Sequence, residues 1–530
     1  MPKRFRTVLA LLLAAAALPA PAGAGLTVGV TDDAGRDSDD GGAAFLATLA
    51  GLGLRENRVS IPWDPDHPTV IPQRDRLHRY VARATARGVR IVFAVYPGRA
   101  TALTGSDAGI PQFAAFLQEL ARAYPLVRHY IVGNEPNQPR FWRPQFDDSR
   151  APVGCSSYAP VLAASYDALK AVDSALEVAG LGLSPRGNDD PLSPDNPSTS
   201  PVRCLRDLGA VYRASGRTKP LMDELAFHAY PERDTHPLGI GYSWPKAGLT
   251  NLDRIKQAVW DAFNGTAQPT FAETGVSVVV KTLGLRIAEV GWQVGTLESA
   301  RGAYTGTENV PTTDEELQAE NYADAVRLAA CDPSIESLLF FGLADERDLA
   351  RWQAGLLRAD GTPRPSFDAV KAAVAETAAG CTSTAIEWRH TTRVVGTATR
   401  FAGARRILPA GQTRWSFSLG AKEDARFTAG LFRLPRAPAA PQWARVIGRA
   451  LAGSAELRPV LKVSGRVRAP WGRVVTLPQR RVKPGYYVYG ARLAADMNPA
   501  RVSVVTSQPF RVGKIDRKGK PQIRKPKRPH

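Results

Sequence analysis

Two glutamates stand at the ends of short apolar runs, where their carboxyl groups could do acid–base chemistry. Glu135 follows the apolar residues 130–132, and Glu289 lies near the end of the apolar run 285–290. Two carboxyl groups that share a pocket can divide a reaction, because one can donate and accept a proton while the other acts as a nucleophile or a base. Since 154 positions separate the two glutamates, only a fold that brings distant strand ends together could pair them.

A parallel β/α barrel meets this requirement, because the carboxyl ends of its strands surround one pocket. Apolar residues recur at helical spacing in 110–124 and 315–330, between runs that are typical of buried strands. This alternation predicts an α/β fold, a (β/α)8 TIM barrel over residues 25–381, with Glu135 after the fourth strand and Glu289 at the end of the seventh. The eight strand-like runs are 26–30, 57–62, 89–96, 129–133, 178–183, 225–230, 285–290 and 335–342.

The pattern changes after Cys381. Short strand-like runs separated by Gly, Pro and Ala follow, with hardly any helical signal, and they predict an all-β sandwich over residues 382–513. The last residues, 514–530, are rich in Lys, Arg and Pro and are expected to be disordered. The clearest strand-like runs of the sandwich are 413–419, 473–477, 486–493 and 501–505.

Charge separates the same two regions. The net charge of the 530 residues is +19, but residues 382–530 contain 31 Lys and Arg against 6 Asp and Glu, which leaves the first 381 residues at −6. A basic surface can bind an acidic cell-surface polymer, an acidic polysaccharide or nucleic acid, and the same charge can also keep a secreted domain soluble. Both interpretations stay open.

The first 24 residues read as a signal peptide. Lys3, Arg4 and Arg6 precede an apolar stretch, and small residues at 22–24 offer a cleavage site, which predicts a secreted protein that is extracellular or associated with the cell wall. A membrane anchor is the alternative, but the stretch is shorter than the roughly 20 residues of a spanning helix. No later segment is apolar enough to span a membrane.

Secretion would place the four cysteines in an oxidising compartment, where an even number predicts two disulfides. Sequence order favours Cys155 with Cys204 and Cys331 with Cys381, and free thiols are the alternative. The spacings lack CxxC or clustered His and Cys, so we expect no metal. No nucleotide fingerprint is present, so we expect no organic cofactor.

Cleavage of a glycosidic bond needs a proton for the leaving oxygen and a nucleophile or base for the anomeric carbon, and two carboxyl groups supply both. Asn134-Glu135-Pro136, His228-Ala229-Tyr230-Pro231 and Glu289-Val290-Gly291-Trp292 follow in order at predicted strand ends. This set resembles the retaining glycoside hydrolases of clan A, TIM-barrel glycosidases of cellulase and xylosidase type. The resemblance covers most of residues 25–380 and does not resolve the family within the clan.

The resemblance implies roles for single residues. It makes Glu135 the acid/base and Glu289 the nucleophile of an O-glycosyl hydrolase that works by double displacement. Asn134 would donate to the sugar 2-hydroxyl. Segment 53–63 resembles the second strand of the clan, which carries an active-site arginine, here Arg58.

Two more residues are expected beside the nucleophile. His228 and Tyr230 would contact Glu289 and the sugar, and they share one face of their strand because side chains alternate with period two. Arg58 and Tyr230 would favour the charged form of Glu289, while Glu135 beside that anion would keep its proton.

Other residues have less definite roles. Trp292 and Trp63 could stack on a sugar ring or belong to the core. Asp223 and Glu224 come at the start of the sixth strand, so we expect them at the opposite rim in a structural role. Residues 184–203 form a long loop on the catalytic face, pinned by the Cys155–Cys204 bridge.

Two alternatives remain beside the retaining mechanism. An inverting or transglycosylating barrel would have a wider spacing of the acids or a cleft that favours an aglycone. A non-catalytic secreted barrel that binds glycans or surfaces, anchored by its basic sandwich, would have splayed acids or a blocked cleft. The expected substrate is a carbohydrate, a β-glycoside or polysaccharide, and the expected state is a monomer; the sugar and linkage stay open.

Overall fold

The computed structural model describes residues 25–105, 109–277, 280–308, 310–391, 396–400, 407–409, 411, 413–421, 423–434, 443–453, 457–468, 473–497 and 501–513. The predicted signal peptide, residues 1–24, and the predicted disordered tail, residues 514–530, lie outside the described residues. Within the described part of the chain, no helix is long and apolar enough to cross a membrane.

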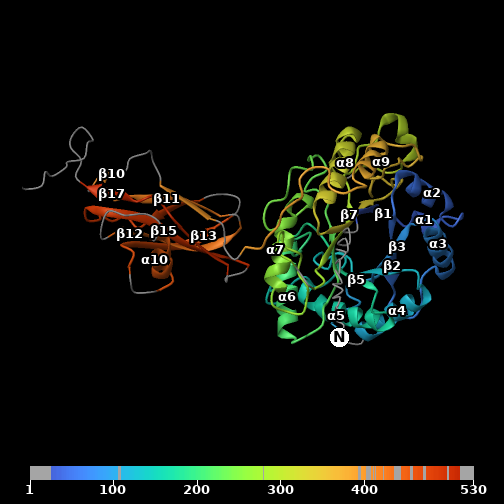
Figure 1. Ribbon diagram of the computed structural model, residues 1–530, viewed down its shortest axis with the longest axis horizontal. Helices are drawn as coiled ribbons and strands as arrows, with labels where there is room; N and C mark the ends of the chain where they lie inside the picture. The colour runs from blue at the N-terminus through green and yellow to red at the C-terminus, as the bar shows by residue number, and fades with distance from the viewer. Residues whose placement is uncertain are drawn as a thin grey trace, which may run out of the picture.

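Eight parallel strands form a closed barrel in sequence order, and β8 pairs with β1 to complete it. Each predicted strand run overlaps one of these strands, so the TIM-barrel prediction is confirmed. Figure 1 shows the helices around the outside of the strands. The strands are β1 Thr27–Thr31, β2 Glu56–Trp63, β3 Arg90–Pro97, β4 His129–Val132, β5 Glu177–Leu183, β6 Glu224–His228, β7 Gly284–Val290 and β8 Ile335–Phe341.

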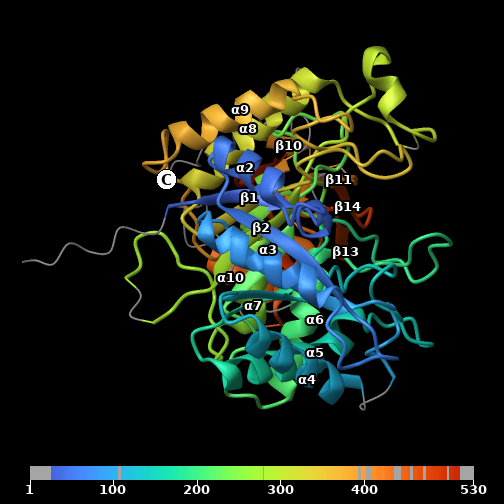
Figure 2. The ribbon, with the colours of Figure 1, turned by 90° about the vertical axis from the view of Figure 1, so that its right-hand side faces the viewer.

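The helices cover the strands with their apolar faces, as in α4, where Phe113, Phe116 and Leu120 recur at helical spacing and are buried. Figure 2 shows α8 and α9 side by side on one flank and α4, α5 and α6 on another. The helices are α1 Ala34–Asp37, α2 Ala43–Leu52, α3 Arg74–Ala86, α4 Gly109–Ala123, α5 Gly154–Val172, α6 Pro201–Ala214, α7 Leu252–Phe263, α8 Glu315–Cys331 and α9 Pro365–Glu376, with short 3-10 helices at Leu249–Asn251 (η1) and Glu298–Ala303 (η2).

The amino-terminal end of the barrel is closed by buried charges. Arg286 of β7 forms ion pairs with Glu56 of β2 and Glu224 of β6, and all three side chains are at most 3% exposed. Burial alone would raise the pKa of Glu224, but the Arg286 charge holds it below its ordinary value. Glu224 therefore lies at the predicted position, the rim opposite the strand ends that carry Glu135 and Glu289.

The C-terminal strands form two sheets that pack on a common apolar core, which confirms the predicted sandwich. One sheet runs β10-β17-β15-β12-β13, with β16 also paired to β15, and the other runs β14-β11-β9. The strands are β9 Gly396–Arg400, β10 Ile407–Pro409, β11 Trp415–Ala421, β12 Ala425–Leu434, β13 Leu461–Val467, β14 Arg473–Leu477, β15 Gly485–Ala495, β16 Val502–Thr506 and β17 Phe510–Gly513.

The expectation of hardly any helix in this region is wrong at one place. Residues Trp443–Leu451 form α10, and its Ile447 packs on Phe432 and Val488 of the six-stranded sheet. The segment is short and follows a Pro-rich stretch, so its helical spacing spans little more than two turns and gives a weak signal in the sequence.

The chain stays against the barrel for some distance after the Cys331–Cys381 disulfide. The backbone N–H of Ile386 donates to the carbonyl of Cys331, and that of Trp388 donates to the hydroxyl of Thr274. His390 then stacks on Trp260 of α7, with ring centroids 3.9 Å apart. Contacts with the barrel therefore extend beyond residue 381, the predicted domain boundary.

A buried cluster of four charges joins the sandwich to the barrel. Arg206 of α6 and Asp261 of α7 form an ion pair at 2.5 Å, and Arg501 and Glu423 of the sandwich form another at 2.6 Å. Arg501 also lies 3.5 Å from Asp261, and each of the four side chains is at most 8% exposed. Because an unpaired buried charge is strongly destabilising, this cluster specifies one orientation of the sandwich on α6 and α7.

Candidate active site

Glu135 is held in a strained backbone position just beyond β4. Its φ of 44° lies in the left-handed region, which non-glycine residues rarely occupy, and Gly133 before it has a φ of 89°. The backbone N–H of Glu135 donates to the carbonyl of Gly182 at 2.8 Å, which ties the turn after β4 to β5. Such strain persists only where the surrounding contacts maintain it, and it is typical of functional sites.

Glu289, near the end of β7, is held by two donors. Arg58 Nη1 donates to Oε1 at 2.8 Å, and the hydroxyl of Tyr230 donates to Oε2 at 2.8 Å. The other guanidinium nitrogen of Arg58 donates to Asn134 Oδ1 at 2.8 Å. This bond fixes the amide of Asn134 so that its NH2 group is left as a donor beside the two glutamates.

His228 connects the two glutamates. Its Nδ1 lies 2.9 Å from Glu135 Oε1 and 3.3 Å from Glu289 Oε2. These two carboxylate oxygens therefore cannot be farther apart than the sum of the two distances, about 6.2 Å. Burial lowers the pKa of His228 to about 4, so at neutral pH the ring is uncharged. Because Nδ1 faces two carboxyl oxygens, the tautomer protonated at Nδ1 suits these contacts.

The two carboxyl groups have different environments. Burial raises the pKa of Glu135 to about 7, against the smaller opposing effects of Ser184 and nearby arginines. The predicted direction agrees, but the main cause is loss of water around the carboxyl group rather than the neighbouring anion. Glu289, in contrast, has a guanidinium and a phenol within hydrogen-bond distance of its carboxyl oxygens.

The two glutamates open into a cavity of about 810 Å³ at the carboxyl ends of the strands. The structure brings Arg58, Asn134, Glu135, Tyr230 and Glu289 to its wall. His228 is fully buried behind them. Four aromatic side chains also line the wall, beside charged residues that include Asp32, Asp33, Arg140 and Glu346: Tyr96, Phe141, Phe341 and Trp352.

Trp292 does not line this cavity, which favours the core role that the sequence left open for it. Its side chain is 1% exposed, packs against Tyr322, and donates from Nε1 to the carbonyl of His236 at 2.9 Å. Trp63 is equally buried. The exposed aromatic face belongs instead to Trp352, which stacks on Tyr230 with ring centroids 4.9 Å apart.

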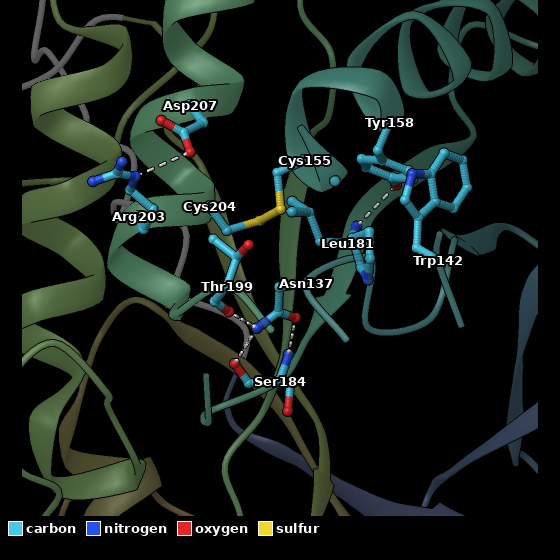
Figure 3. The surroundings of a disulfide bond; sticks show 12 residues. Asn137, Trp142, Cys155, Tyr158, Leu181, Ser184, Thr199, Arg203, Cys204 and Asp207 are labelled. Atoms are coloured by element: carbon cyan, nitrogen blue, oxygen red, sulfur yellow. Dashed lines mark hydrogen bonds and ion pairs between the residues drawn. A yellow bond between two sulfur atoms is a disulfide. The ribbon is translucent and has the colours of Figure 1, made fainter. Parts of the chain in front are cut away.

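One buried side chain joins both ends of the long loop after β5. The buried amide of Asn137 donates to the carbonyls of Ser184 and Thr199 and accepts from the backbone N–H of Ser184, so it joins both ends of the loop to the turn that carries Glu135 (Figure 3). The Cys155–Cys204 disulfide links α5 to α6 beside this loop. The predicted disulfide is present, but its cysteines lie in the helices rather than in the loop.

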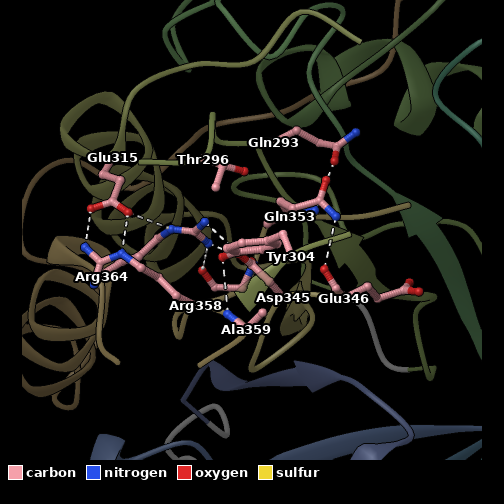
Figure 4. A network of polar contacts seen from close by, with 12 residues as sticks. Gln293, Thr296, Tyr304, Glu315, Asp345, Glu346, Gln353, Arg358, Ala359 and Arg364 are labelled. Carbon is pink, nitrogen blue, oxygen red and sulfur yellow. Dashed lines mark hydrogen bonds and ion pairs between the residues drawn. The ribbon is translucent and has the colours of Figure 1, made fainter. Parts of the chain in front are cut away.

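A second network supports the loop after β8. Arg364 donates to both carboxylate oxygens of Asp345 at 2.6 Å, and Tyr304 donates to Asp345 as well (Figure 4). The backbone N–H of Gly355 also donates to Oδ1 of Asp345, at 2.9 Å. These bonds hold the turn after β8 against the segment that carries Trp352.

Sequence reasoning assigned no role to Asn137, Asp345 or Trp352. Asn137 directly follows the Glu135-Pro136 pair, and Trp352 comes ten residues after the predicted eighth strand, 335–342. The sequence shows that each of them lies in a loop next to a strand end, but this position does not tell where a side chain points. Within the described residues, no group of His, Cys, Asp and Glu is arranged to hold a metal ion.

Comparisons with known proteins show similarity in structure alone. No family model matches the chain, and no curated protein matches its sequence. Solved structures similar to it include a family 39 glycoside hydrolase from Bacteroides cellulosilyticus WH2 (17% identity, 79% of this chain and 74% of that one, TM-score 0.44). Others are a glucosidase from Croceicoccus marinus (13%, 87% and 94%, 0.44) and GH5_18 from Streptomyces cattleya in complex with Manβ1-4GlcNAc (16%, 73% and 85%, 0.44).

Proposed function

We propose that the protein is a secreted retaining glycosidase that hydrolyses O-glycosyl bonds of a β-glycoside or polysaccharide. The observation that carries the proposal is the pairing of Glu135 and Glu289 across His228 at the mouth of the barrel. The wall of the cavity in front of them combines aromatic side chains, such as Trp352 and Phe341, with polar and charged groups, features that suit a sugar ring.

In the first step, Glu289 as carboxylate attacks the anomeric carbon while protonated Glu135 donates its proton to the departing oxygen. Arg58 and Tyr230 hold Glu289 in the orientation for attack. In the second step, Glu135 as carboxylate removes a proton from water, which displaces Glu289 and releases the sugar. The free NH2 of Asn134 is placed to donate to a sugar hydroxyl during both steps.

The carboxyl spacing favours the retaining mechanism over the inverting one. Retaining enzymes place their two carboxyl groups roughly 5–5.5 Å apart, whereas inverting enzymes leave about 6.5–9.5 Å for a water molecule. The facing oxygens are at most about 6.2 Å apart, and this limit supports the shorter carboxyl spacing of retaining enzymes. A non-catalytic binding barrel would be favoured by splayed acids or a blocked cleft, and neither occurs at these residues.

The proposal is tested with a panel of aryl β-glycosides. Glu289→Gln and Glu135→Gln are each expected to reduce hydrolysis at least about a thousandfold, whereas Glu298→Gln, at an exposed position of η2, retains activity. Proton NMR of the first product is expected to show retained configuration. Full activity in either site variant would exclude these roles, and an inverted product would exclude the retaining mechanism.

Azide distinguishes the roles of the two acids. With Glu289→Ala, azide is expected to attack the anomeric carbon directly and give a product of inverted configuration. With Glu135→Ala, azide is expected to intercept the glycosyl intermediate on Glu289 and give retained configuration. The same product from both variants would contradict the assignment of acid/base and nucleophile.

Secretion and the acidic polymer partner are further parts of the proposal. Two disulfides support an oxidising compartment. N-terminal sequencing of protein from the culture medium is expected to begin near Gly25. The basic C-terminal charge supports contact with an acidic polymer, and the monomeric state stays a prediction that sedimentation would check.

A further inference from the structure

The outer face of the six-stranded sheet is covered by α10 over one part only. A Cβ at Gly490 of β15 would lie 2.4 Å from Ile447 of the helix, so the helix lies directly on this strand. Toward β13, which pairs with β12 alone among the described strands of this sheet, the face is not covered by the helix. Apart from Ala494 opposite Arg426 and Gly430 opposite Lys462, its outward positions are polar or basic: Arg426, Thr428, Lys462, Ser464, Arg466 and Arg492.

The strand register places like charges opposite each other on this face. Arg426 pairs directly with Arg466, and Thr428 lies between Ser464 on one side and Arg492 on the other. Like charges at opposed positions are destabilising unless an anion lies between them. Asp496 contacts both Arg426 and Arg466, at 3.4 and 3.6 Å, so one carboxylate serves two guanidinium groups.

The basic charge on this face exceeds what Asp496 can balance. Arg426 and Arg466 are 57% and 69% exposed, and Lys462 and Arg492 form no ion pair within the described residues. Strands lie about 4.8 Å apart, and alternate residues on a strand about 7 Å apart. Arg426 and Arg466 therefore lie about 5 Å apart on adjacent strands, Arg492 lies roughly 8–9 Å from Arg426, and Lys462 lies roughly 14 Å from Arg466 along β13. The four cations share one face of the sheet.

The side chains on the face favour one kind of polyanion. The buried aromatics Trp415, Phe417, Tyr487, Tyr489 and Phe510 lie between the two sheets. Among the described residues, the uncovered part of the outer face has no aromatic side chain on which bases could stack, as proteins that bind single-stranded nucleic acid usually have. Guanidinium groups match carboxylates in geometry, and Thr428 and Ser464 add hydroxyls that can bond to sugar hydroxyls.

We infer that the uncovered face formed by Arg426, Thr428, Lys462, Ser464, Arg466 and Arg492 binds a polysaccharide that contains uronic acids. The choice of a polysaccharide rests on the proposed glycosidase function, whereas the charge argument does not depend on it. The buried cluster around Arg501 holds the sandwich to α6 and α7, so a polymer on this face keeps the barrel close to a glycan surface.

Two variants with equal loss of charge test the inference in the full-length protein. Lys462→Gln/Arg466→Gln/Arg492→Gln alters the face but leaves Arg426 on Asp496. Arg480→Gln/Arg481→Gln/Lys483→Gln removes the same residue types from exposed positions before β15. Both keep the basic residues 514–530. Affinity for polygalacturonate is measured by isothermal titration, with dextran, polyphosphate and oligodeoxythymidylate as comparison ligands.

We expect the first triple variant to weaken polygalacturonate binding about tenfold or more, and the second to change it less than about twofold. Equal weakening by both variants, or no weakening by the first, would overturn the inference, as would tighter binding to polyphosphate or oligodeoxythymidylate.

Lys462→Gln/Arg492→Gln, which leaves both arginines on Asp496, is expected to weaken binding at least threefold if the triple variant does not fold. Both triple variants should hydrolyse an aryl glycoside like the wild type; a wild type without hydrolysis would refute the proposed function but not the surface.

Discussion

Replacing Glu135 by Gln should remove activity and at the same time stabilise the protein in a pH-dependent way. Burial raises the pKa of Glu135 from about 4.5 to about 7. Below pH 4.5 the group is protonated in both the folded and the unfolded chain, so it has no effect on stability. Between pH 4.5 and 7 the unfolded chain loses this proton first, so the free energy of unfolding falls as pH rises.

The size of the effect follows from the two pKa values. At about 1.4 kcal/mol for each pH unit between them, ionised Glu135 costs the fold about 3.5 kcal/mol above pH 7. Gln has the same shape without the charge, and its amide oxygen can still accept from His228. For a barrel of this length, the variant should melt about 4 °C higher than the wild type at pH 8 and nearly equally at pH 4.5.

Thermal unfolding of both proteins, followed by circular dichroism from pH 4.5 to 8, measures this difference. Glu289→Gln provides the contrast, because it leaves buried Arg58 without its carboxylate and should lower stability at pH 8. A pH-independent difference between wild type and Glu135→Gln would refute the argument that burial sets this pKa. The wild-type kcat/KM should also fall as pH rises through about 7, because the first step needs protonated Glu135.

Three more outcomes are expected. Tyr230→Phe removes one donor from Glu289 and should lower kcat/KM about 10- to 100-fold with little change in thermal stability. Asn137→Ala leaves buried backbone groups without partners and should lower the free energy of unfolding by about 2–3 kcal/mol while speeding amide exchange in residues 184–200. Cys155→Ser/Cys204→Ser opens a loop of 49 residues and should lower stability by up to about 4 kcal/mol in urea unfolding.

The barrel could be predicted because its strands are apolar on both faces and therefore appear as continuous runs between helical segments. Once Glu135 and Glu289 are placed on the fourth and seventh strands, closure of the barrel brings them to one rim. The strand period likewise placed His228 and Tyr230 on one side. These inferences depend on local patterns that a single sequence contains.

Loop residues could not be placed in this way. Trp292 and Trp352 are both tryptophans next to strand ends, but one is buried and the other lines the cavity. The difference arises from contacts distant in sequence, such as the carbonyl of His236 that accepts from Trp292 and the Arg364–Asp345 pair that holds the segment of Trp352. No periodicity in the chain encodes such contacts.

The contrast between the two barrel rims shows why a glutamate's chemistry follows from its surroundings. The side chain of Glu224 is 3% exposed and that of Glu135 17%, but the partner of Glu224, Arg286, lies within the barrel and keeps the pKa of Glu224 low. Glu135 has no ion-pairing arginine at its carboxyl group among the described residues; its close partner is the neutral ring of His228. Burial without a cation therefore makes Glu135 able to hold a proton near neutral pH, and an arginine introduced beside it should abolish that property.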